Sequence, residues 1–176
     1  PEGGLWAPPE GYPAWTPVDR PALAVDVAMV VGGQPVVVTA PLRYAEVDRV
    51  LGERVERVEV APPLMVTPSR PVVMLPGGKA QTVTMAVEAA IDGVKGEVRL
   101  ALPAGWRSEP AAAPVSLEKA GQQAQVSLKV TPPGANAAPA VVAAEAVVAG
   151  RAWSWSVRRI DYEHIAPRRV LAPAQV

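Results

Sequence analysis

The chain has 176 residues, which is enough for one sizeable β-sandwich or for one complete domain with a smaller flanking piece. Its 21 prolines, about twice the usual share, argue against long helices, and abundant valine and alanine with no phenylalanine suit sheets better than helix bundles. Seventeen basic residues balance 17 acidic ones, so nucleic acid is not an expected partner, and the absence of cysteine excludes disulfides and thiolate metal sites.

The first 21 residues, PEGGLWAPPEGYPAWTPVDRP, predict an irregular lead-in, because prolines and glycines interrupt any regular element there. Trp6, Tyr12 and Trp15 lie between them. Such rings can form a sugar-binding or polyproline-type surface, although the simpler interpretation is that they anchor the lead-in on a neighbouring domain. Trp6 and Trp15 are therefore candidate contacts for a glycan or a partner. No apolar stretch anywhere approaches the roughly 20 residues that span a bilayer, so no membrane span is expected.

Residues 22–44, ALAVDVAMVVGGQPVVVTAPLRY, predict a β-hairpin. Two apolar strands flank Gly32 and Gly33, a pair that suits the positive φ angles of a tight turn. The next stretch, AEVDRVLGERVERVEVAPP, carries apolar residues near helical spacing, but its glycine and double proline favour loop and strand. Residues 1–61 are thus assigned to a lead-in and a small β segment, which is either a partial or a small second β domain.

Residues 62–161 predict an immunoglobulin-like antiparallel β-sandwich, with a closed barrel as the lesser alternative. PLMVTPSRPVVML indicates two short strands broken by prolines, and AVVAAEAVVAGRAWSWSVRRI indicates a long-armed hairpin around Ala149 and Gly150. Three strands between them alternate apolar and polar residues. The residues expected to face inward are Val83, Met85, Val87, Ala89, Val98, Leu100, Leu102, Val126, Leu128 and Val130, with Glu88 facing outward. Residues 162–176 are assigned to a C-terminal tail.

Trp106 follows the point at which one inward-facing row ends. Pro103 and Gly105 are expected to turn the chain there, so that the ring closes one end of a core built from small residues. Burying a ring of that size stabilises a domain by about 2 to 3 kcal/mol. An exposed, sugar-stacking ring is the alternative.

Trp153 and Trp155 are expected on the same side of the last strand, beside Arg158 and Arg159. If that side is exposed, the two indoles can stack on a sugar or on a protein, and they are therefore candidate contacts. If it faces inward, they are the main core aromatics, which the shortage of other large residues favours. The arginines at 158, 159, 168 and 169 are expected to pair with glutamates at the surface.

The stretch GEVRLALPAGWRSEP, followed by VSLEKAGQQAQVSLKVTPP, resembles bacterial immunoglobulin-like domains of the NEW3, or alpha-galactosidase-associated, type, which occur beside glycosidase and carbohydrate-binding modules. In that pattern a strand runs into Leu-Pro-x-Gly-Trp and a later strand closes on Thr-Pro-Pro. The matching positions are Leu102, Pro103, Gly105, Trp106, Gly121, Val126, Leu128, Val130, Thr131, Pro132 and Pro133.

Two further stretches, LRYAEVDRVLGERVERVEVAPPLMVTP and IDYEHIAPRRVLAPAQV, are similar to the region that follows the catalytic domain in large bacterial PIG-L (LmbE-like) deacetylases. Those enzymes remove N-acetyl groups from glucosamine-type sugars with a bound zinc ion. The resemblance covers most of residues 36–176 and concerns only the non-catalytic part. It implies an exported, periplasmic or extracellular protein whose partners are neighbouring domains of the same polypeptide.

The catalytic signature of that family, His-Pro-Asp-Asp with a distant histidine, is absent from this sequence. His164 is the single histidine, so the zinc site cannot be assembled, and no catalytic, metal-binding or cofactor-binding residue is carried over. His164 could act as a base with Asp161 or Glu163, but a structural role is the simpler interpretation. The sequence thus predicts a non-catalytic accessory module with a filled interior and no reactive pocket, a carbohydrate-binding module being the alternative.

Overall fold

The computed structural model describes residues 21–50, 52–162 and 165–176. The chain divides into two compact units, Pro1–Val60 and Ala61–Val176. The described parts of both units are built from antiparallel strands, and the described residues contain no α-helix. The predicted all-β class is confirmed.

The N-terminal unit contains two β-hairpins. Their strands are β1 (Ala24–Val31) with β2 (Gln34–Pro41), and β3 (Arg43–Asp48) with β4 (Gly52–Arg57). Gly32 and Gly33 have φ angles of 58° and 80°, as the two central residues of a type I′ hairpin turn require. The first hairpin is therefore confirmed, and the ambiguous stretch after it forms strands, with Gly52 at φ 80° where β4 begins.

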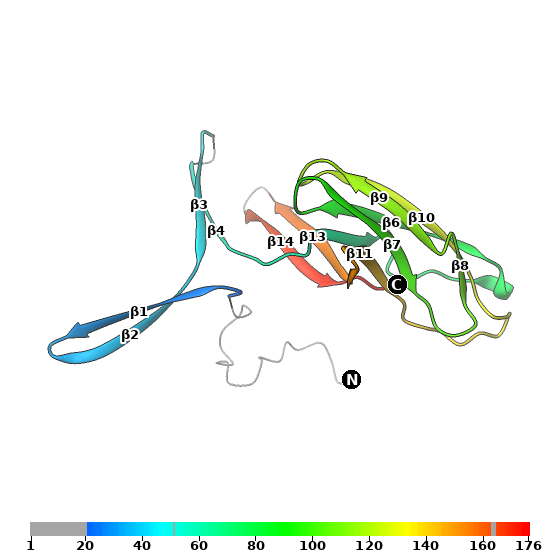
Figure 1. The fold of residues 1–176 in the computed structure, drawn as a ribbon, viewed down its shortest axis with the longest axis horizontal. Coiled ribbons are helices and arrows are strands. Elements are labelled where there is room, and N and C mark those ends of the chain that lie inside the picture. The colour runs from blue at the N-terminus through cyan, green and yellow to red at the C-terminus, as the bar shows by residue number, and fades with distance from the viewer. Residues whose placement is uncertain (1–20, 51, 163–164) are drawn as a thin grey trace. The chain divides into compact units, whose positions relative to one another are not determined.

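The second unit is an immunoglobulin-like sandwich of two four-stranded sheets (Figure 1). Its strands are β5 (Leu64–Pro68), β6 (Gln81–Ala89), β7 (Val94–Ala101), β8 (Arg107–Glu109), β9 (Ala112–Leu117), β10 (Gln123–Thr131), β11 (Ala143–Val148) and β12 (Arg151–Trp153), with a short 3-10 helix at Pro76–Gly78. One sheet has the order β5-β6-β10-β8 and the other β12-β11-β7-β9. These orders correspond to the A-B-E-D and G-F-C sheets of immunoglobulin-like domains, with β9 added beside β7.

The core lies between these sheets and is made of the rows that the alternating pattern predicts. The buried members from β6, β7 and β10 are Val83, Met85, Val87, Ala89, Val98, Leu100, Val126, Leu128 and Val130. Strand β11 contributes Ala144 and Ala146, whose small side chains let its backbone approach the facing sheet. Leu102 is only partly buried because it follows the end of β7.

Some strand assignments need correction. In the stretch expected to form two strands around Pro68 and Pro71, only β5 forms, since Pro71–Leu75 makes no ladder. Strands β8 and β9 were not expected, because β8 has only three residues, all polar, and β9 begins with two alanines and a proline. The hairpin turn at Ala149 and Gly150 is confirmed, but its second arm ends at Trp153 and a new strand, β13 (Trp155–Tyr162), begins after Ser154.

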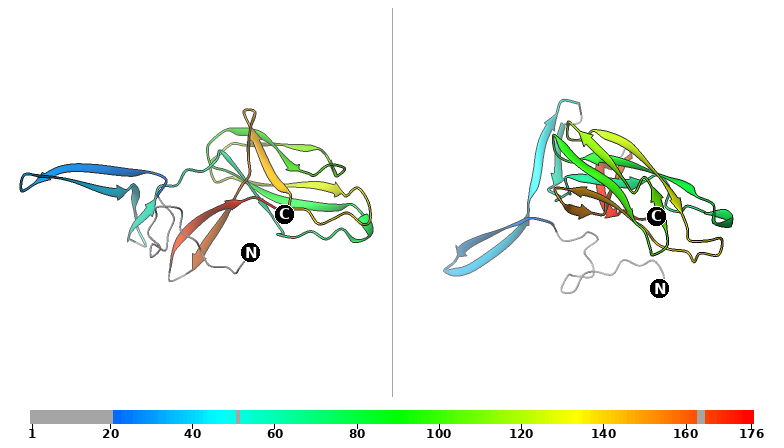
Figure 2. Two further views of the ribbon diagram at one scale, coloured as in Figure 1. Left: turned by 90° about the horizontal axis from the view of Figure 1, so that it is seen from below. Right: turned by 45° about the vertical axis from the view of Figure 1, so that its right-hand side comes forward.

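The C-terminal residues are not a tail. Strand β14 (Ile165–Pro173) pairs antiparallel with β13, and the two form a separate hairpin, orange and red in Figures 1 and 2. Beyond β14 the chain pairs with β11 and with the residue before it: Ala144 N donates to Ala174 O, and Val142 and Val176 exchange N–H···O bonds of 2.8 and 2.9 Å. Ala174 is fully buried in the core. The tail assignment fails because prolines and arginines mask any period-two pattern in this stretch.

Candidate functional site

The tryptophan pair expected on the last strand is split between two sheets. Trp153 is the last residue of β12 and Trp155 the first of β13, with Ser154 between them. Ser154 Oγ donates to Ala174 O, and Ala174 N donates to Ser154 O, so this break is held to the C-terminal segment. The two rings therefore do not share one face of one strand.

Neither ring belongs to the core of the sandwich. Trp153 is half-buried, and the guanidinium carbon of Arg151 lies 4.0 Å from the centroid of its ring, a cation–π contact that covers one face. Trp155 is 42% exposed. The core interpretation of this pair is wrong, because valine, leucine, methionine and alanine fill the space between the sheets. Trp6, Trp15, Glu163 and His164 lie outside the described residues.

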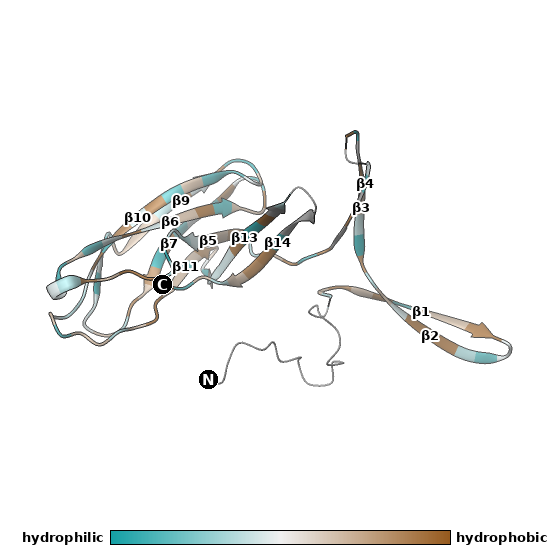
Figure 3. Ribbon diagram, turned by 180° about the vertical axis from the view of Figure 1, so that it is seen from behind, coloured by the Kyte–Doolittle hydropathy of each residue, from teal (hydrophilic) through white to brown (hydrophobic). Residues whose placement is uncertain are grey.

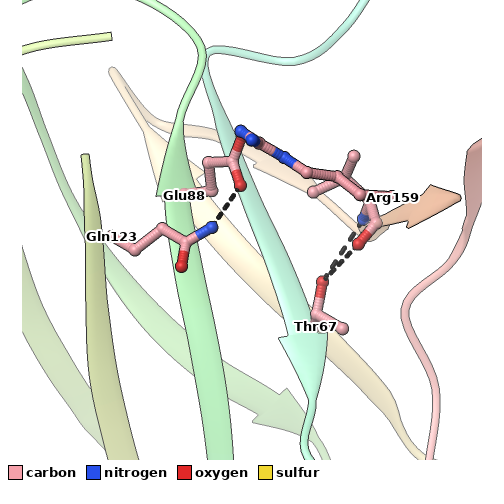
Figure 4. Close-up of polar contacts among 5 residues, drawn as sticks. Thr67, Glu88, Gln123 and Arg159 are labelled. Atoms are coloured by element: carbon pink, nitrogen blue, oxygen red, sulfur yellow. Dashed lines mark hydrogen bonds and ion pairs between the residues drawn. The ribbon is translucent and has the colours of Figure 1, made fainter. Parts of the chain in front are cut away.

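Glu88 is the one buried charged residue in the described part of the chain, and it was expected to face solvent. Its Oε2 accepts a 2.6 Å hydrogen bond from Gln123 Nε2, and its Oε1 lies 3.2 Å from Arg159 Nη2 (Figure 4). Only 4% of Glu88 is exposed. Both carboxylate oxygens have partners, so Glu88 is satisfied as a structural ion rather than held ready for reaction.

The hairpin β13–β14 explains this burial. Met65 on β5 lies opposite Glu88 in the ladder with β6, and both side chains point away from the main core. Strand β13 contacts β5, and Thr67 Oγ1 bonds both the N–H and the carbonyl of Val157 at 3.3 and 3.4 Å. The hairpin β13–β14 therefore covers part of the outer face of the sheet that contains β5 and β6. Its Arg159 lies 71 positions after Glu88 in the sequence.

We expect Arg159→Ala to lower the free energy of unfolding by about 1 to 2 kcal/mol, because it leaves a buried carboxylate without its cation. The expected loss is not larger because the guanidinium of Arg159 is half-exposed and its charge is screened by solvent. Arg158→Ala, on an exposed neighbour in the same strand, is the matched control and should change stability by less than about 0.5 kcal/mol. Urea denaturation followed by circular dichroism measures both. Equal losses of stability in the two variants would contradict a stabilising role for the Glu88–Arg159 ion pair.

A cavity of about 440 Å³ opens at the Trp106 end of the sandwich. Its floor consists of Val83, Leu100 and Val130, which also belong to the core. Two irregular segments, 71–75 and 134–142, supply most of its wall, and Trp106 with Leu102 supplies another side. Every side chain that lines it is apolar or absent, because the lining contains only proline, valine, leucine, alanine, glycine and tryptophan.

Trp106 packs against the core as expected but does not close it. Trp106 N donates to Pro103 O at 3.2 Å, and Gly105 takes a φ of 83°, which completes the turn that aims the ring inward. The expectation of a filled interior is wrong at this end, because the segment GANAAPA has side chains too small to fill the space beside the ring. That run of small residues is the signal by which the cavity could have been found.

The described residues contain no group of three or more histidine, cysteine, aspartate or glutamate side chains placed to hold a metal ion. Within the same residues, no helix is long and apolar enough to cross a membrane. No protein-family model and no curated protein matches the chain. The resemblance to NEW3-type domains and to the non-catalytic region of PIG-L deacetylases therefore stays a prediction.

Proposed function

We propose that this chain is a non-catalytic accessory module that packs against a neighbouring catalytic domain of the same polypeptide and positions it. The observation that carries the proposal is the apolar face of the hairpin β1–β2. Val25, Val27 and Met29 share this face with Val36 and Val38 of the paired strand. Each of these side chains is between 39% and 49% exposed. Figure 3 shows apolar stretches along both strands.

An isolated two-stranded hairpin is marginally stable in water, because it has no second layer on which to bury its apolar face. A face made of valine and methionine across both strands is the composition of a sheet that packs on another surface. The opposite face also exposes two apolar side chains, Val30 and Val37, but the bonded polar pair Asp26 and Thr39, whose oxygens lie 2.7 Å apart, interrupts it. The face of Val25, Val27 and Met29 has no such pair in its middle, and we propose it as the surface that meets the partner.

The identity of the partner follows from the resemblance described above. The proposed neighbour is a zinc-dependent, PIG-L-type deacetylase domain acting on N-acetylglucosamine-type sugars, in an exported polypeptide. The module contributes packing surface and spacing, while the zinc ligands and the general base belong to the neighbour. In this proposal the hairpin β1–β2 makes the contact with the catalytic domain, and the sandwich acts as the spacer.

Hydrogen exchange tests the proposal, on this chain and on the whole polypeptide that its gene encodes. We expect the amides of β1–β2 to exchange at least about a hundredfold more slowly in the whole polypeptide, because docking adds to the free energy of opening. Val27→Lys on the apolar face should abolish that added protection. Ala28→Lys, the neighbouring position on the opposite face, should retain it.

Equal exchange of the hairpin amides in the two forms would contradict the docking proposal. Acetate release from N-acetylglucosamine oligomers is expected from the whole polypeptide and not from this chain. Release by this chain would overturn its assignment as non-catalytic.

A carbohydrate-binding module is the second candidate, favoured by the exposed ring of Trp155. Aromatic rings bind sugars by stacking, and β13 presents this ring at the surface of the second unit. Calorimetric titration with N-acetylglucosamine oligomers separates the two candidates. Saturable heat that is lost in Trp155→Ala would support the glycan-binding function, whereas a positioning module gives no heat with any glycan.

A further inference from the structure

We propose that the cavity beside Trp106 is a binding site for the hydrocarbon chain of an anionic amphiphile. This site is distinct from the hairpin β1–β2 and does not depend on the function proposed above. Its volume of about 440 Å³ lies within the range of about 300 to 1,000 Å³ that small-molecule sites occupy.

The chemistry of the lining selects a hydrocarbon. The floor is formed by Val83, Leu100 and Val130, the wall by prolines, alanines and valines, and one side by the indole of Trp106. None of these side chains offers a hydroxyl, an amide or a charged group. Apart from the indole N–H of Trp106 and exposed backbone groups, a sugar would find nothing here to replace its hydrogen bonds to water, whereas an alkyl chain has none to lose. The cavity is therefore unsuited to a glycan, including one that could stack on the exposed ring of Trp155.

The wall is held in place by close backbone contacts, which make the cavity largely preformed. Gly78 has a φ of 70°, and a Cβ built there would lie 2.7 Å from Ala135 N. A Cβ on Gly105 would lie 3.2 Å from Pro133 Cβ. The turn at Gly78 thus approaches Ala135, in segment 134–142, more closely than a residue with a Cβ would allow, and the turn at Gly105 packs tightly on Pro133, the residue before that segment. A preformed site binds without the entropy loss of ordering its walls.

Two of the lining side chains are also exposed to solvent. Val72 and Val141 are 70% and 76% exposed. A hydrocarbon chain that extends out of the cavity could therefore keep apolar contacts with both of them.

The charges on the wall segments determine the sign of the headgroup. Arg70 precedes the first lining segment, Lys79 follows the 3-10 turn and Arg107 follows Trp106, and all three are exposed. The segments 70–79, 102–107 and 131–142 contain no aspartate or glutamate. Glu109, two residues after Arg107, lies opposite Lys129 in the β8–β10 ladder, so cations outnumber carboxylates in and next to these segments. This excess of positive charge favours a carboxylate or phosphate on the ligand, although the net charge of the whole chain is zero.

Isothermal titration calorimetry of the full chain with laurate, below its micellar concentration, tests the site. We expect saturable binding of one laurate per chain. Ala137→Phe, which places a large ring at a lining position, should abolish it. Asn136→Phe, at the adjacent exposed position that does not line the cavity, is the matched control and should bind laurate as the wild-type chain does. Circular dichroism confirms that both variants are folded.

The headgroup preference has its own comparison. The double variant Arg70→Gln/Arg107→Gln should bind laurate about fivefold to tenfold more weakly, the effect of losing one or two exposed charge contacts. Binding of uncharged dodecanol should not change in this variant, and dodecyltrimethylammonium should bind less well than laurate to the wild-type chain. Lys129→Gln, on an exposed strand position outside the wall segments, should leave laurate binding unchanged.

The proposal is overturned if laurate does not bind, if Ala137→Phe binds it undiminished, or if the cationic amphiphile binds as tightly as laurate. Co-sedimentation with phosphatidylglycerol vesicles then identifies the source of the chain. Vesicle binding that is lost in Ala137→Phe identifies a membrane lipid as the ligand. Laurate binding without vesicle binding identifies a free fatty acid.

Discussion

Ala174→Asp will lower the free energy of unfolding of the sandwich unit by about 3 to 5 kcal/mol, a large share of the stability of an ordinary domain. Ala174 is fully buried between the sheets, and its backbone bonds both Ala144 and Ser154. The described residues of the core cluster that contains Ala174 are all apolar, so a new carboxylate would be buried among them without compensation. Urea denaturation monitored by circular dichroism gives the change in midpoint and slope.

Ala172→Asp is the matched control, because it makes the same chemical change two residues earlier at an exposed position of β14. It should change stability by less than about 0.5 kcal/mol. The difference between the two variants measures the burial of the C-terminal segment alone. If both variants unfold at the same urea concentration, the segment after β14 does not complete the sandwich as described.

Leu128→Ala will destabilise the same unit by about 2 to 5 kcal/mol, the usual range for removing a fully buried leucine from a packed core. Leu128 lies at the middle of β10 with no exposed surface and belongs to the row shared with Val126 and Val130. Both neighbouring strands are fixed by ladders on β10, so the site cannot collapse fully and a cavity remains.

Lys129→Ala, the next residue and exposed, isolates the effect of the core from that of shortening a side chain on β10. It should shift the unfolding free energy by less than about 0.5 kcal/mol. Thermal unfolding followed by circular dichroism compares the two variants with the wild-type chain. A loss of stability in Lys129→Ala as large as that in Leu128→Ala would mean that the two faces of β10 are not distinguished by burial.

The two proposed binding features use different parts of the fold. The hairpin β1–β2 offers an apolar face for contact with another protein surface, and the Trp106 cavity offers a concave site of about 440 Å³ for a hydrocarbon chain. Variants in one should leave the other unchanged. Val27→Lys is therefore expected to bind laurate normally, and Ala137→Phe is expected to retain the hairpin contact.

The strands of the sandwich could be predicted where one face of the strand is buried and the other is exposed to solvent. On β6 and β10, valine, methionine and leucine alternate with threonine, serine and lysine, and the structure buries the expected members of both rows. Gly32 and Gly33 identified the first hairpin turn because few other residues take two successive positive φ angles. These features depend on the local backbone, which a sequence encodes directly.

The other features arise from contacts between distant segments. The burial of Glu88 requires β13, and the docking of Ala174 requires β11, so neither position carries a local pattern that reveals its environment. The break at Ser154, which separates Trp153 from Trp155, follows from the pairing of β13 with β14 rather than with β11.

By itself, the amino-acid sequence determined the all-β class, the first hairpin and the inward rows of the sandwich, because alternation with a period of two decides which side of a strand can face apolar neighbours. Only the tertiary structure decided which outward positions are covered again and where the interior is left open. The physical reason is that covering Glu88 and leaving space beside Trp106 depend on the volume supplied by chain segments far away in the sequence, which no local spacing records.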